Sequence, residues 1–193
     1  PNTLGGLSLQ GKVLASLSQS VSPRTAGYNT IDIGKMYDGT LFLLIILMFI
    51  GASPSSTGGG IKTSTASVLL IAIIALIRGK HDAECYGRRI PKEYIYKAFS
   101  ILFISFMLVV IVTMALTITE QVSFLAILFE VTSAFGTVGL STGITPFLSN
   151  PGKAWLIFIM FAGRVGPMTL ALAIAMRTRK VHVQYPDGKI IIG

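Results

Sequence analysis

Three observations predict an all-α integral membrane protein with re-entrant half-helices and one broken transmembrane helix. Hydrophobic residues make up 52% of the chain and charged residues only 12%, whereas soluble domains contain about 25% charged residues. Residues 98–119 carry no charge and residues 154–176 carry one, Arg164, so each segment has the roughly 20 apolar residues that cross a bilayer. Polar, glycine-containing segments interrupt the other apolar runs, which predicts interrupted helices.

Basic residues are sorted to one side of the predicted membrane. The segment 78–97 holds six of them and more follow at 177–180, whereas the connections 31–40 and 144–153 hold one each. Because cytoplasmic loops are enriched in Lys and Arg, we expect a multi-pass plasma-membrane protein with a cytoplasmic C-terminus. The net charge of +8 then faces membrane lipid, and we expect no nucleic-acid partner.

The chain offers little for other chemistries. Its single Cys85 excludes an internal disulfide, and His81 with Cys85 is too small a set for a zinc site. The glycines at 58–60 precede a lysine as in a nucleotide-binding loop, but Ile61 stands between Gly60 and Lys62 and no strand precedes the glycines. We therefore expect no enzyme activity, no covalently bound cofactor and no metal site other than one for a transported ion.

An internal repeat relates two polar segments. Residues 17–34 match residues 129–146 at a constant offset of 112, so that "TAGY" from Thr25 falls on "TVGL" from Thr137. A short helix is expected before each segment, over about 9–22 and 122–134, and neither reaches the ~17 residues that a spanning helix needs. The repeat therefore predicts two half-helices, each ending at a Thr-x-Gly segment on the outer side.

These segments predict a pore for a monovalent cation. An extended Thr-x-Gly segment can aim carbonyl oxygens into a lumen, where they replace the hydration shell of an alkali ion, and glycine permits the dihedral angles that this requires. The negative end of each half-helix dipole would point to the ion path. The predicted filter residues are Thr25, Ala26, Gly27, Tyr28, Asn29, Thr137, Val138, Gly139, Leu140 and Ser141.

The stretch 51–65 is predicted to break a membrane helix. Helices over 41–51 and 66–78 would measure about 16 and 20 Å, and together they suffice to cross ~30 Å of hydrocarbon. Between them, Pro54 and three glycines oppose helix and the hydroxyl side chains compete for backbone partners. Because its amides and Lys62 are costly against lipid, the loop is expected to face water or protein near mid-membrane.

Two further charges fall within predicted helices. Arg164 needs a polar partner inside the bundle, and loop carbonyls, Glu130 and Glu120 are the alternatives. Glu130 lies in the second half-helix, where it could brace the filter by accepting backbone donors or face an aqueous vestibule.

Four motifs together resemble the SKT superfamily of potassium transporters: "SPRTAGYNT" (22–30), "GGGIKTST" (58–65), "GTVGLSTG" (136–143) and "AGRVGP" (162–167). The resemblance covers the whole chain and implies helix, pore half-helix and helix repeats of the potassium-channel type, four per chain, each giving a quarter of one filter. Residues 1–92 would be the third repeat without its first helix, and residues 93–193 the fourth repeat with a C-terminal tail.

The resemblance also implies a mechanism and partners. The loop would be the gate below the filter, with Arg164 as its partner, and the gate residues would be Ser55, Ser56, Thr57, Gly58, Gly59, Gly60 and Lys62. Potassium would be the substrate and sodium an activator. The protein would be a homodimer on a cytosolic RCK-type nucleotide-binding ring, with the tail that ends at residues 190–192 docked at the subunit contact.

One alternative function remains open. A sodium-coupled secondary transporter also places a broken helix at its substrate site. It would not require two Thr-x-Gly segments in register on the outer side, which is why cation conduction through a filter is the favoured prediction.

Overall fold

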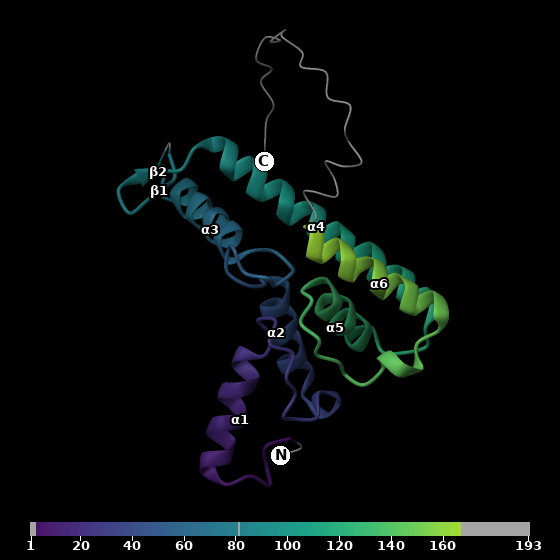
Figure 1. Cartoon of the computed structure of the whole chain (residues 1–193). Coiled ribbons are helices and arrows are strands. Elements are labelled where there is room, and N and C mark those ends of the chain that lie inside the picture. The colour runs from purple at the N-terminus through teal and green to yellow at the C-terminus, as the bar shows by residue number, and fades with distance from the viewer. Residues whose placement is uncertain (1–2, 81, 167–193) are drawn as a thin grey trace.

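The computed structural model describes residues 3–80 and 82–166, and this part of the chain is mostly helical (Figure 1). In chain order the elements are α1 (Leu9–Val21), the 3-10 helix η1 (Ile33–Lys35), α2 (Asp38–Phe49), α3 (Thr63–Ile77), β1 (Glu84–Cys85), β2 (Arg88–Arg89), α4 (Lys92–Thr119), α5 (Phe124–Phe135), the 3-10 helix η2 (Thr145–Phe147) and α6 (Asn150–Val165). The expected helical class is confirmed. Among the described residues, α4 alone is long and apolar enough to cross a membrane.

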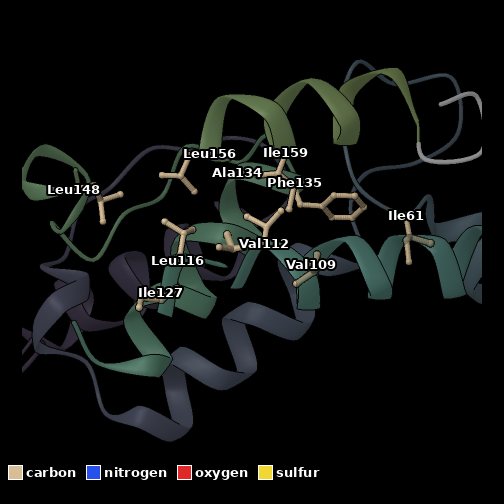
Figure 2. Close-up of a cluster of buried hydrophobic side chains, with 11 residues drawn as sticks. Ile61, Val109, Val112, Leu116, Ile127, Ala134, Phe135, Leu148, Leu156 and Ile159 are labelled. Carbon is tan, nitrogen blue, oxygen red and sulfur yellow. The ribbon is translucent and has the colours of Figure 1, made fainter. Parts of the chain in front are cut away.

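The short helix α5 lies at the centre of the fold. It packs against α2, α4 and α6, and every residue from Phe129 to Phe135 is buried. Figure 2 shows apolar side chains of α4 and α6, among them Val112 and Ile159, gathered with those of α5 into one cluster. Each fully buried side chain of this kind contributes about 1.5–3 kcal/mol. The C-terminal end of α5 is therefore held firmly at the segment that follows it.

Helix α1 has a similar length but a different environment. Gln19 is its one buried residue, and large apolar side chains such as Leu9 and Leu14 are exposed. Ser8 caps its start by accepting a hydrogen bond from the Gly11 N–H at 3.2 Å, as N-cap serines do. Figure 1 shows α1 beside α2 at the edge of the molecule. Few of the described residues therefore pack against this helix.

The broken helix is present, but its loop is shorter than predicted. The first half, α2, starts at Asp38, whose carboxylate suits a helix N-terminus. The second half, α3, starts at Thr63, so the last three residues of the predicted loop 51–65 are helical. The first turn of a helix tolerates hydroxyl side chains because its N–H groups have no intrahelical partners. That is why Thr63 and its two neighbours belong to α3.

The last helix also differs from the prediction. Residues 154–176 were expected to cross the membrane as one segment, whereas α6 begins at Asn150 and ends at Val165, with Gly166 at a φ of +94°. Glycine is the residue that adopts this conformation readily, and a residue before proline avoids helical angles. The other predicted features of residues 167–193, including the basic residues at 177–180 and the apolar tail, lie outside the described residues.

Gly163 lets α6 pass directly over the end of α5. A Cβ at this position would overlap the Phe135 carbonyl group, with its carbon at 2.8 Å. Gly163→Ala is therefore expected to lower stability by about 1–3 kcal/mol, as overpacking does, and to displace the end of α5. Thermal unfolding of the purified full-length protein in detergent measures this.

The matched control is Gly39→Ala in the first turn of α2. A Cβ there meets nothing within 4 Å, and alanine favours helix over glycine by about 1 kcal/mol. The Gly39→Ala protein should unfold at the same temperature as the wild type or slightly above it. An equal loss of stability in both variants would contradict the close contact at Gly163.

Candidate functional site

The two Thr-x-Gly segments adopt the same unusual backbone conformation. Thr25 and Thr137 have φ values of +65° and +51°, and Gly27 and Gly139 have values of +72° and +90°, while the residue between each pair is not in the positive-φ region. Positive φ is uncommon for threonine. Alternating left-handed and right-handed dihedrals turn successive N–H groups to one side of the chain. Because the peptide is planar and trans, the carbonyls then point to the other side.

Hydrogen bonds show which side of each segment carries the N–H groups and which side carries the carbonyls. The Ser22 carbonyl accepts from the N–H groups of Ala26 and Gly27 at 3.2 and 3.3 Å. In the second copy, the Ser133 carbonyl accepts from the Val138 N–H at 2.9 Å. The N–H groups therefore face the preceding helix in both copies, so the carbonyls of the threonines and of Ala26 face away from it.

The structure brings the two segments together although 112 residues separate them. A Cβ on Gly27 would overlap the Val138 carbonyl oxygen, and one on Gly139 would lie 3.8 Å from the Gly27 Cα. The side chains of Val138 and Leu140 are buried, whereas Tyr28 and Asn29 are exposed. The two segments thus meet at their glycines.

Glu130 holds the chain just beyond the second segment. It is 5% exposed. One carboxylate oxygen accepts from the Ser141 hydroxyl at 2.5 Å and from the Thr142 N–H and hydroxyl at 2.9 and 3.2 Å, and the other accepts from the Thr145 hydroxyl at 2.9 Å. A buried carboxylate is tolerated when its oxygens are satisfied in this way. Of the two expected roles, the contacts favour bracing.

The loop between α2 and α3 is closed at its neck and reaches the threonines. Ile50 and Ile61 form a bridge, with the Gly51 N–H donating to the Ile61 carbonyl at 2.8 Å. At the tip, the Gly59 N–H donates to the Thr137 hydroxyl at 2.9 Å. A Cβ on Gly58 would lie 2.7 Å from the Thr25 hydroxyl oxygen. The loop therefore contacts both Thr-x-Gly segments at their threonine end.

Two cations hold three consecutive carbonyls of this loop. Lys62 donates from Nζ to the carbonyls of Ser56 and Gly58 at 3.2 and 2.5 Å. Arg164 donates from one guanidinium nitrogen to the carbonyl of Thr57. Hydrogen bonds with a charged donor are roughly twice as strong as neutral ones. Arg164 is exposed on this chain rather than enclosed, which differs from the expected position inside a bundle.

The other proposed partners of Arg164 are engaged elsewhere. Glu130 accepts the donors described above, and Glu120, at the end of α4, accepts from the Ser149 N–H at 3.2 Å and from the Ser149 hydroxyl. The Ser149 hydroxyl lowers the pKa of Glu120 below its usual value, with help from the Ser149 backbone and the Lys153 charge. Of the three alternatives, the loop carbonyl is the one that the geometry supports.

Two further predictions concern residues of the basic segment 78–97. His81 lies outside the described residues, and Cys85 is a free thiol in β1. The described part of the chain contains no group of three His, Cys, Asp or Glu side chains that could hold a metal ion.

Sequence reasoning missed several residues of the site. Ser22 and Ser133 were not singled out, although each also donates its hydroxyl to a carbonyl of its Thr-x-Gly segment. Thr142 and Thr145, which bind Glu130, were missed as well. The available signal was a glutamate in a helix followed within 15 residues by a run of hydroxyl residues. This pattern does not show which of the hydroxyl groups binds the glutamate.

Comparison with known proteins places the chain in a family. The family model TrkH, described as "Cation transport protein", matches residues 3–182. The chain is 46% identical to Ktr system potassium uptake protein B of Bacillus subtilis (strain 168) over 193 residues, 100% of this chain and 43% of that protein. It is 39% identical to Ktr system potassium uptake protein B of Vibrio alginolyticus, again over 100% of this chain and 42% of the relative.

A third relative agrees. Ktr system potassium uptake protein D of Bacillus subtilis (strain 168) is 41% identical over 192 residues and 43% of its length. The chain thus spans less than half the length of these relatives. The resemblance predicted from the four motifs is confirmed, and the chain belongs to the TrkH family of cation transport proteins, which are membrane proteins.

Proposed function

We propose that the full-length protein conducts potassium across the plasma membrane through a carbonyl-lined filter to which this chain contributes two segments. The observation that carries the proposal is the shared conformation of those segments. Thr25 and Thr137, each followed two residues later by a glycine, have the same alternation of φ, and the two segments meet where Gly27 faces the Val138 carbonyl. The names of three relatives, all potassium uptake proteins, support potassium as the ion.

The charges around the segments favour a monovalent cation. Helices α1 and α5 both end just before their segment, so the negative ends of their dipoles lie beside the carbonyls. The ten proposed filter residues include no carboxylate, and carbonyls without net charge hold a divalent ion weakly compared with a carboxylate cage. Glu130 lies behind the second segment, where its charge attracts cations without coordinating them.

The pore requires more chain than is described. Four segments around one axis would surround an ion, and two are supplied here. Since the curated relatives are more than twice as long, we propose that the remaining part of the protein supplies the other two. In this arrangement residues 1–92 act as the third repeat and residues 93–193 as the fourth.

We propose that the loop between α2 and α3 is the gate. It contacts the threonine end of both segments, and Arg164 and Lys62 hold its carbonyls. In this position the backbone of the loop blocks the ion path and the two positive charges raise a barrier to cations. Opening requires that the carbonyl of Thr57 leaves Arg164.

The remaining parts of the system follow from the family. We propose a multi-pass homodimer with a cytoplasmic C-terminus, seated on a cytosolic RCK-type nucleotide-binding ring such as KtrA, and activated by sodium. The charge asymmetry of the loops supports the orientation. The hairpin β1–β2 and the basic residues around it are the proposed contact for that ring.

Potassium uptake by cells that lack their own uptake systems tests the proposal. Cells expressing the full-length protein should grow at low potassium, and Gly139→Ser should lower uptake about fivefold, because a side chain at positive φ costs about 1–3 kcal/mol. Gly79→Ser is the matched control and should leave uptake unchanged, since Gly79 follows α3 away from the filter and has a φ of +66° with nothing within 4 Å of its Cβ position. Uptake that does not respond to the Gly139 change would favour the sodium-coupled transporter instead.

A further inference from the structure

We infer that Ser22 and Ser133 are positioning residues that turn one carbonyl of each filter segment away from the ion path. The Ser22 hydroxyl donates to the carbonyl of Tyr28 at 2.5 Å, and the Ser133 hydroxyl donates to the carbonyl of Leu140 at 2.6 Å. Both serines are buried, at 2% and 1% exposed. The inference rests on the proposed filter function and specifies how many carbonyls each segment offers.

Each serine contacts its segment twice. Its own carbonyl accepts the N–H of the residue after the threonine, Ala26 in the first copy and Val138 in the second. Its hydroxyl binds the carbonyl of the residue after the glycine. The peptide planes at the two ends of the segment are therefore turned in opposite senses, because N–H and C=O point in opposite directions in a trans peptide.

This geometry limits the row of carbonyls that faces the ion. The threonine carbonyl points away from the half-helix, whereas the carbonyl of Tyr28 or Leu140 points back to the serine. Each segment therefore ends its ion-facing row at the glycine. Ion discrimination depends on the number of coordinating carbonyls and on how firmly they are held, so the two serines contribute to selectivity without touching an ion.

The two copies reach this arrangement through different spacings. The bond spans six residues in the first copy and seven in the second, and a constant offset of 112 would pair Ser22 with Ala134 instead of Ser133. The same contact is therefore built twice despite a one-residue difference in the turn. A chance hydrogen bond in one copy would not be repeated in the other.

Selectivity measurements on full-length variants test the inference. Ser133→Ala leaves the buried Leu140 carbonyl without its donor, and a cavity of about 360 Å³ lined by Ser133, Gly139 and Leu140 gives that peptide room to reorient. The ratio of potassium to sodium uptake is expected to fall about fivefold while the amount of protein in the membrane is unchanged. Ser22→Ala should act in the same direction. Ser133→Thr keeps the hydroxyl, has room for its methyl group in the cavity, and should retain the wild-type ratio.

Ser105→Ala is the matched control. Ser105 is completely buried in α4 and donates its hydroxyl to the Ile101 carbonyl at 2.6 Å, so it loses the same kind of bond away from the filter. Its potassium to sodium ratio should not change. An unchanged or increased ratio in Ser133→Ala, or an equal fall in Ser105→Ala, overturns the inference. A wild-type protein that takes up no potassium would instead overturn the proposed function.

Discussion

Deleting Gly58, Gly59 and Gly60 should raise potassium flux through the full-length protein about tenfold. The deletion removes the Gly59 bond to Thr137 and the Gly58 carbonyl that Lys62 holds. A charge-assisted hydrogen bond contributes about 1.5–3 kcal/mol. A change of about 1.4 kcal/mol in the free-energy difference between the closed and open loop changes their equilibrium constant tenfold. Flux of rubidium into vesicles that contain the purified protein measures the change.

A point variant separates release of the gate from general damage to the loop. Arg164→Ala removes the donor to the Thr57 carbonyl and leaves the loop intact, so it should raise flux in the same direction. Lys35→Ala is its control, because Lys35 is an exposed cation that pairs with Asp32 at 2.9 Å instead of with a carbonyl of the loop. If neither the deletion nor Arg164→Ala changes flux, the loop is not the gate.

Replacing Glu130 by alanine should reduce potassium uptake at least tenfold. The change leaves the Thr142 N–H and the hydroxyls of Ser141 and Thr145 without their acceptor. These donors are partly buried, and a buried donor that loses its partner costs about 1–3 kcal/mol, so residues 141–145 should leave their position and the second filter segment should lose its support. Uptake per molecule of protein in the membrane is the measurement.

The isosteric variant tests the role of the charge. Glu130→Gln keeps one acceptor oxygen for Thr142, and its amide can donate to the Thr145 hydroxyl, so uptake should fall only severalfold. Glu93→Ala, an exposed glutamate in the first turn of α4, should behave like the wild type. Normal uptake by Glu130→Ala would show that residues 141–145 do not depend on this carboxylate.

The helical elements were predictable because their signals are local. Two apolar runs predicted α2 and α3. Pro54 and three glycines predicted the loop between them. The short helix before each Thr-x-Gly segment followed from length, and the observed α5 starts and ends within two residues of the prediction. Whether these elements carry ions stays a prediction.

The supports of the site could not be predicted because they depend on which groups meet in space. The repeat was aligned at one constant offset, so Ser22 and Ser133 fell out of register although they make the same contacts. Glu130 was recognised as a brace or a vestibule residue, but its hydroxyl partners were not. For Arg164 the sequence shows the charge, while only the packing of α6 against the end of α5 shows that the side chain reaches Thr57.

The bridge between Ile50 and Ile61 sets the timescale on which the loop can move. The bridge ties the two ends of the loop together, and Ile61, only 1% exposed, belongs to the same buried cluster as Phe135. Residues 51–60 can therefore leave the threonines while α2 and α3 stay packed. Loop motions of this kind take nanoseconds to microseconds, whereas displacements of whole helices take microseconds to milliseconds. Opening and closing of this segment should therefore be fast compared with any rearrangement of the surrounding helices.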